Sequence, residues 1–126
     1  MTVNFTIEGR FPGLNELIAA ERANKFKGAQ MKAGYTNMAY YAAKEQLRGV
    51  TFTRPVAVTF RFVEKDRRRD LDNIAGFAHK VILDGLVQAG VLADDGWNEV
   101  TGISDSFAVD KARPRIEVTL EEVGDG

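Results

Sequence analysis

The chain has 126 residues, of which 44% are hydrophobic and 28% are charged, and its net charge is −1 at pH 7. This composition is ordinary for one compact unit, so we expect a single domain over residues 1–126. No apolar stretch is long enough to span a membrane, the N-terminus lacks the layout of a signal peptide, and cysteine is absent. We therefore expect a cytoplasmic protein without disulfides, membrane contact or a small-molecule cofactor.

The charges are distributed unevenly along the chain. Residues 1–69 carry thirteen Lys and Arg against six Asp and Glu, whereas residues 70–126 carry four against twelve. A basic half can contact a polyanion, and an acidic half can hold cations, so this distribution suits an enzyme that acts on nucleic acid. Solvated faces that differ by chance are the alternative.

Hydrophobic periodicity predicts the order of the elements. Val3, Phe5 and Ile7 alternate with polar residues and predict a first strand over 2–8. The remaining elements follow in chain order: helices from about Asn15 to Lys25 and from about Gln30 to Arg48, a strand over 54–63, a helix from after Asn73 to near Gly90, and strands over roughly 99–109 and 114–123. The order β-α-α-β-α-β-β predicts an α+β fold, with a mixed sheet of about four strands packed against two to three helices.

Three acidic positions are candidates for metal binding. Asp70 and Asp72 flank Leu71 where a turn leads into the third helix. If that segment is extended, both carboxylates point the same way. Asp94 and Asp95 lie in the turn beyond the same helix. Hard ions such as Mg²⁺ prefer carboxylate oxygens, and Mn²⁺ is an alternative ion for such a site.

The third helix separates these positions. A helix of roughly 18 residues is about 27 Å long, so one ion cannot bridge its two ends within one chain. The helix is then broken, with Gly76 as the candidate position, or the second acidic group comes from the partner in a symmetric dimer. Without a metal, Asp72 or Asn73 would cap the helix and Asp94-Asp95-Gly would be a plain turn.

These residues occur in a pattern that resembles a known family. Arg67-Arg-Arg-Asp-Leu-Asp-Asn, followed by Lys80-Val-Ile-Leu-Asp-Gly-Leu, Gln88-Ala-Gly and Asp94-Asp95, resembles the RusA-type Holliday-junction resolvases. Members of that family are small homodimeric enzymes of bacteria and phages that cut branched DNA with magnesium. The resemblance implies that Asp70, Asp72 and Asp95 bind the metal and that Lys80 is a catalytic lysine.

The position of Lys80 departs from the family's founding pattern. Four more residues separate Asp72-Asn from the lysine than in that pattern. A loop around Gly76 would let Lys80 reach the scissile phosphate, whereas an extra helical turn would displace it by about 6 Å. An exposed helical lysine paired with Asp84 at i,i+4 is the alternative.

Basic and aromatic residues are candidates for DNA contact. Beside the acidic positions we expect phosphate contacts from Lys65, Arg67, Arg68 and Arg69, and from a second, mobile patch formed by Lys25, Lys27 and Lys32. Tyr40 and Tyr41 are candidates for stacking on unpaired bases, whereas Tyr35 lies on an apolar stripe and is expected in the core. We expect His79 to be an incidental helix residue and Trp97 to pack beneath the turn that follows the third helix.

The resemblance, taken together with these residues, implies a magnesium-dependent endodeoxyribonuclease that resolves Holliday junctions by paired nicks. In it, a metal-activated water hydrolyses the phosphodiester, and Lys80 stabilises the developing charge. The expected partners are four-way or other branched DNA and a second copy of the chain. Three alternatives stay open: a nuclease for flaps, forks or other branched DNA, a branched-DNA binder without cleavage, and a structural phage or interaction protein.

Overall fold

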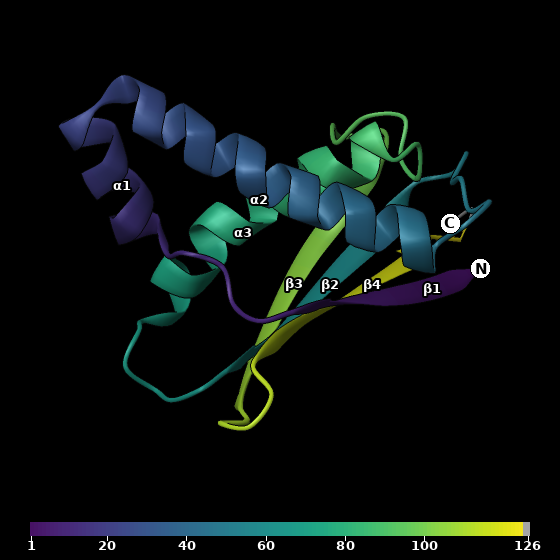
Figure 1. The fold of residues 1–126 in the computed structure, drawn as a ribbon. Helices are drawn as coiled ribbons and strands as arrows, with labels where there is room; N and C mark the ends of the chain where they lie inside the picture. Colours follow the sequence, from purple (N-terminus) through teal and green to yellow (C-terminus); the bar gives the residue numbers. More distant parts are fainter. Residues whose placement is uncertain (125–126) are drawn as a thin grey trace.

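A computed structural model describes residues 1–124, and its elements follow the expected order (Figure 1). In chain order they are β1 (Thr2–Glu8), α1 (Leu14–Ala23), α2 (Lys25–Gln46), β2 (Val56–Glu64), α3 (Leu71–Gln88), β3 (Val100–Val109) and β4 (Arg115–Glu122). The prediction of one α+β domain with a four-stranded mixed sheet is confirmed.

The four strands form an open sheet in the order β1-β4-β2-β3. β4 pairs antiparallel with β1 and β2, whereas β2 and β3 run parallel. A parallel pair needs a crossover connection, and α3 supplies it. Among residues 1–124, β3 pairs with β2 alone, so its outer edge is open.

The helices cover one face of the sheet (Figure 1). β2 shows why, because Val58, Phe60 and Phe62 are buried at alternate positions while Arg61 between them is exposed. The opposite face is polar, and there Arg61 Nη1 lies 3.0 Å from Glu117 Oε1. The hydrophobic core therefore lies between the helices and one side of the sheet.

α3 is the central helix of this core. Its buried residues share one hydrophobic cluster with those of β2 and β4, and the helix contacts α2 and α1 directly. The crossing with α2 is close, since a Cβ added at Gly85 would lie 2.7 Å from Ala39 Cβ. Tyr35 packs between Phe11 and Phe77, with ring centroids 4.8 and 5.8 Å away, as expected of a core residue. Within residues 1–124, no helix is both long and apolar enough to cross a membrane.

The start of α2 differs from the prediction. This helix begins at Lys25, five residues before the expected start at Gln30, and only Asn24 separates it from α1. The Asn24 backbone N–H donates to Ala20 O and closes α1, while its side-chain oxygen accepts a bond from Phe26 N–H at 2.8 Å. One capping residue therefore joins the two helices, and the basic segment around Lys27 is helical rather than a mobile loop.

α3 has no break. It runs as a continuous α-helix from Leu71 to Gln88, and Gly76 lies within it, where a Cβ would meet the Leu14 side chain at 3.4 Å. That is an ordinary packing distance, so Gly76 is a regular helical position beside α1 rather than part of a loop. The idea that a break at Gly76 brings the two ends of the helix together is wrong.

Candidate active site and nucleic-acid interface

Asp70 and Asp72 lie at the start of α3. Asp70 is the N-cap residue, with extended backbone angles (φ −68°, ψ 153°), but its side chain makes no capping bond. Asp72 lies in the first helical turn. The segment from Asp70 to Asp72 is therefore not extended, contrary to the condition under which both carboxylates were expected to point the same way. Both are exposed, and neither forms an ion pair within residues 1–124. The amide end of the helix stabilises negative charge there.

Asn73 has a structural role at this position. Its Oδ1 accepts a hydrogen bond from Asn15 N–H at 2.8 Å, which satisfies a free amide at the start of α1. Gly13 makes this approach possible, since a Cβ there would lie 2.7 Å from the Asn73 amide. The capping function of this motif therefore falls to Asn73, and it serves the neighbouring helix.

Asp94 and Asp95 lie beyond the other end of α3. Asp94 Oδ1 accepts a bond from Asp95 N–H at 2.8 Å, and Asp95 is half-buried beside a concavity of 340 Å³. The intact helix, about 27 Å long, separates the turn that contains Asp95 from the start of α3. Within the described residues, no three carboxylates or histidines gather where they could share one metal ion.

The donor set nevertheless suits a hard cation at the start of α3. Mg²⁺ is commonly held by one or two carboxylates and keeps its other positions for water and substrate phosphate. Asp70 and Asp72 supply two carboxylates with no basic partner, in a solvent-accessible turn. One protomer therefore offers two of the three expected ligands.

The two polar residues in the middle of α3 differ in what they contact. Lys80 is exposed, and its Nζ lies 3.3 Å from Asp84 Oδ1, which is the i,i+4 pair described above. Its Cα lies about 12 Å along the helix axis from that of Asp72. His79 Nε2 lies 2.7 Å from Asp105 Oδ1, and its ring packs 4.7 Å from that of Phe60. His79 thus ties α3 to the edge strand β3, which is more than an incidental role.

Arg69 is held inside the fold. Its side chain is 12% exposed, and its guanidinium makes a two-nitrogen contact with the buried Glu64 at 2.9 to 3.0 Å. A further nitrogen donates to Phe11 O at 2.9 Å, and Arg10 lies 3.8 Å from the same Glu64. A phosphate contact by Arg69 would compete with these bonds. The arginine holds the chain that leads to Asp70, and this role was not predicted.

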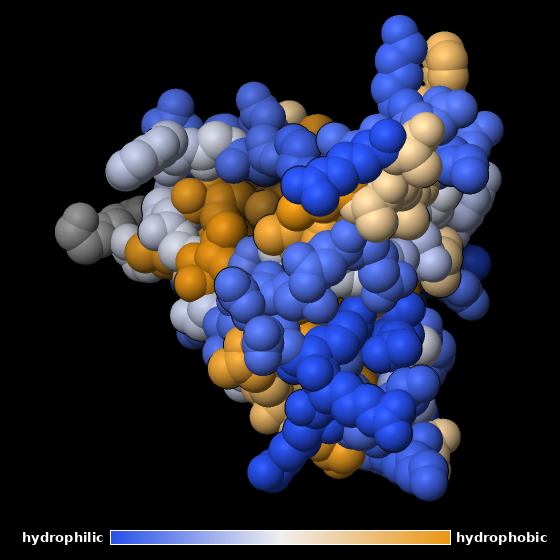
Figure 2. Space-filling model, turned by 90° about the vertical axis from the view of Figure 1, so that its left-hand side faces the viewer, coloured by the Kyte–Doolittle hydropathy of each residue, from blue (hydrophilic) through white to orange (hydrophobic). Residues whose placement is uncertain are grey.

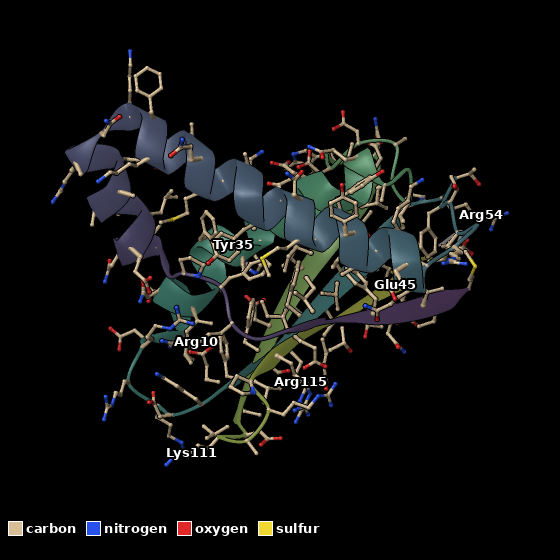
Figure 3. All side chains as sticks on the ribbon, in the orientation of Figure 1. Arg10, Tyr35, Glu45, Arg54, Lys111 and Arg115 are labelled. Carbon is tan, nitrogen blue, oxygen red and sulfur yellow. The ribbon has the colours of Figure 1, made fainter. Side chains whose placement is uncertain are left out.

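Other cations at the same end of the molecule are accessible. Exposed cations in the loop that leads to α3 are Lys65, Arg67 and Arg68. Lys111, from the turn between β3 and β4, is also exposed and lies beside them. Lys65, Arg68 and Lys111 line a concavity of 340 Å³ together with Asp66. Figure 3 shows Lys111 at the lower tip of the molecule, and Figure 2 shows hydrophilic side chains over the lower part of the adjoining face. The sequence does not indicate that Lys111 lies near this site, because it is 41 residues from Asp70; its position becomes apparent only in the folded chain.

The neighbouring arginines of the β3–β4 turn are already paired. Arg115 Nε donates to Glu117 Oε2 at 2.8 Å, and its Nη1 donates to Asp110 Oδ2 at 3.1 Å. The hydrogen bond from Arg115 lowers the pKa of Asp110, and hydrogen bonds from Arg115 and then Arg61 lower that of Glu117. These bonds fix the turn that presents Lys111.

The loop after α3 exposes an aromatic side chain. Trp97 is 96% exposed, so the expectation that it packs beneath the turn is wrong. It borders the same concavity as Asp95 and the start of β3, where Ile103 is 47% exposed. Large apolar side chains therefore lie exposed along the open edge of the sheet.

Comparison with models of protein families gave a match. The model of the family described as endodeoxyribonuclease RusA matches residues 15–121 of the 126-residue chain. A search of curated proteins found no match. The matched range contains the whole of α3 and the acidic positions on both sides of it.

Proposed function

The chain belongs to the RusA endodeoxyribonuclease family, and from that premise we propose that it is a magnesium-dependent nuclease that nicks opposing strands of a four-way DNA junction. One observation carries the metal dependence: Asp70 and Asp72 are exposed carboxylates without basic partners, at the start of a rigid helix. A purely structural role does not explain them, because Asp70 makes no capping bond and both carboxylates would repel the DNA phosphates that the nearby Lys65, Arg67 and Arg68 attract.

In this proposal the residues of the site have three different roles. Asp70 and Asp72 hold the cation, with the helix amide end facing their charge. When bound, Mg²⁺ lowers the pKa of a coordinated water and neutralises charge on the phosphate. Lys65, Arg67 and Lys111 hold the neighbouring phosphates and fix the strand in place. Lys80 remains a candidate for stabilising the transition state, although its pairing with Asp84 has to open first.

The third carboxylate comes from a second copy of the chain. α3 is unbroken, so of the two routes that could unite its ends only a dimer is left. In this account Asp95 of the partner subunit completes the site begun by Asp70 and Asp72. A two-fold dimer then contains two such sites, as paired nicks in opposing strands require.

The open edge of β3 is the surface that suits this dimer. A ten-residue edge strand without lysine or proline is a template for pairing with another chain. Leu71 lines a concavity with Val109 at the end of β3, whereas Asp95 lines one with Val100 at its start. Antiparallel pairing of two β3 strands sets the end of one beside the start of the other. It therefore brings the Asp72 turn of one protomer toward Asp95 of the partner subunit.

The seam can be tested by the oligomeric state. Ile103→Arg places a charge on the exposed edge and should give monomers in sedimentation velocity, whereas Val123→Arg, at another exposed apolar position, should leave the dimer intact. A wild-type chain that is monomeric at micromolar concentration would contradict the paired-nick account.

The metal site can be tested by exchanging single carboxylates for amides. Asp70→Asn and Asp72→Asn should each abolish nicking of a four-way junction in magnesium, while binding in EDTA is retained. Glu45→Gln, at the far end of α2, is the matched control and should nick normally (Figure 3). Magnesium should also raise the thermal midpoint of the wild-type protein but not that of Asp70→Asn. Normal cutting by Asp70→Asn would remove that residue from the site.

Two other activities are distinguished by the same assays. A nuclease for flaps or forks would use the same aspartates and would differ only in the substrate it cuts. A branched-DNA binder without cleavage would bind the junction tightly and show no magnesium-dependent product.

A further inference from the structure

An exposed phenylalanine lies where α1 meets α2. Phe26 is 65% exposed, although phenylalanine is among the residues most often buried. Lys25 and Lys27 flank it, and Lys25 Nζ lies 5.4 Å from the centre of its ring. The first turn of α2 contains no acidic residue. This tip, residues 24–27, is therefore a cationic surface that presents one aromatic ring.

The tip is held by helix capping and close packing. Asn24 is the only residue between the two helices and caps both. Gly28 packs so closely on α1 that an added Cβ would lie 2.4 Å from Glu21 Cγ, and Lys32 Nζ lies 3.8 Å from Glu21 Oε1. The ring of Phe26 is thus held out from the fold at little cost in entropy on binding.

The tip has a fixed position relative to the acidic turn. α1 starts at the Asn15–Asn73 hydrogen bond, next to the first turn of α3. Its ten residues rise about 15 Å from there to the tip. In Figure 1 the tip is the upper left corner of the molecule, beyond the sheet and on the same side as the start of α3. DNA held at Asp70 and Asp72 can therefore reach the tip.

We propose that Phe26 stacks on a DNA base that is exposed at a branch point, while Lys25 and Lys27 hold the adjoining phosphates. This inference rests on the proposed function and assigns selection of branched DNA to the tip. In an intact duplex, neighbouring base pairs cover both faces of each base, so the ring has no partner there. A branch point interrupts the stack, and aromatic side chains stack on such free base faces without sequence preference.

The charge of the tip favours nucleic acid over a second copy of the chain. Arg22, Lys25 and Lys27 lie within four residues of Phe26 in the sequence, and the nearby carboxylate of Glu21 is paired with Lys32. A two-fold contact through this tip would bring like charges together, which is unfavourable. A phosphate backbone instead complements them, and the lysines add a salt-dependent contribution to binding.

Binding in EDTA, where the nuclease does not cut, separates the contribution of the ring from that of charge. Phe26→Ala should weaken binding to a four-way junction by about 5- to 100-fold, the loss expected for one stacked base, and should leave binding to linear duplex unchanged. Phe26→Trp should bind the junction like wild type. The matched control is Met38→Ala, which removes an apolar side chain that is 46% exposed, about 18 Å further along the same helix. It should change neither affinity.

A fluorescent base provides a second measurement. With 2-aminopurine at the branch point, wild-type protein should change the fluorescence, and Phe26→Ala should not. Equal affinity of Phe26→Ala and wild type for the junction, or an equal loss on junction and duplex, would overturn the stacking proposal while leaving the nuclease assignment intact. Failure of the wild-type protein to bind or cut any branched DNA would instead overturn the proposed function itself.

Discussion

Mixing two inactive variants tests whether the acidic site is shared between subunits. Asp72→Asn removes a carboxylate at the start of α3, and Asp95→Asn removes one beyond the other end of this helix, which is about 27 Å long. If a site combines Asp72 with Asp95 of the partner subunit, each homodimer lacks one ligand in both of its sites. A mixed dimer keeps one complete site, because one protomer supplies the intact Asp72 and the other supplies the intact Asp95.

The expected recovery follows from the statistics of mixing. With equal amounts and random reassociation, about half of the dimers are mixed, and each has one of its two sites complete. The mixture should therefore recover about one quarter of the wild-type nicking rate, and its products should be single rather than paired nicks. The assay uses a 5′-labelled four-way junction after the variants have been unfolded and refolded together, with each variant refolded alone as control. Mixed dimers that are present by native mass spectrometry but do not nick would refute the shared site.

Three further predictions concern stability and DNA contact. Arg69→Ala should lower the free energy of unfolding by about 3–5 kcal/mol in urea titrations, because it removes the close hydrogen bonds to the buried Glu64 and leaves only Arg10, 3.8 Å away; a loss near zero would show that Arg10 or water replaces the guanidinium. Lys111→Ala should weaken binding to junction and duplex alike and reduce the salt slope by about 1, and an unchanged slope would remove Lys111 from the DNA surface. The pKa of Glu117 is lowered by hydrogen bonds from Arg115, so the stability it contributes is complete above its unfolded pKa and is lost as pH falls through the folded value. Glu117→Gln should therefore flatten the loss of stability below about pH 4.3, and an acid unfolding curve identical to that of wild type would contradict this.

Much of the fold follows from periodicity in the sequence. The alternation in Val58, Phe60 and Phe62 predicts β2 because one face of that strand is buried and the other is solvated. The start of α2 could not be placed in the same way. Residues 22–28 contain no proline and only one glycine, so helix propensity changes little across the boundary, and Asn24 is the one capping signal.

The candidate site is less accessible to sequence reasoning than the fold. The length of α3 already indicates that Asp72 and Asp95 cannot meet in one chain, and the unbroken helix removes the exception at Gly76. Roles that depend on tertiary contacts were missed. A run of three arginines suggests a solvated surface, yet Arg69 folds back on Glu64, and nothing local distinguishes it from Arg68. Trp97 was expected to be buried from its residue type alone, whereas it lies at an open sheet edge.

The most direct test of the account is cleavage by the wild-type protein of a four-way junction, a flap and a linear duplex, side by side in magnesium and in EDTA. The account predicts symmetric nicks in opposing strands of the junction, in magnesium only, and no cutting of the duplex. Tight binding to the junction without cutting in any divalent metal would contradict it and would leave Asp70 and Asp72 without a catalytic role.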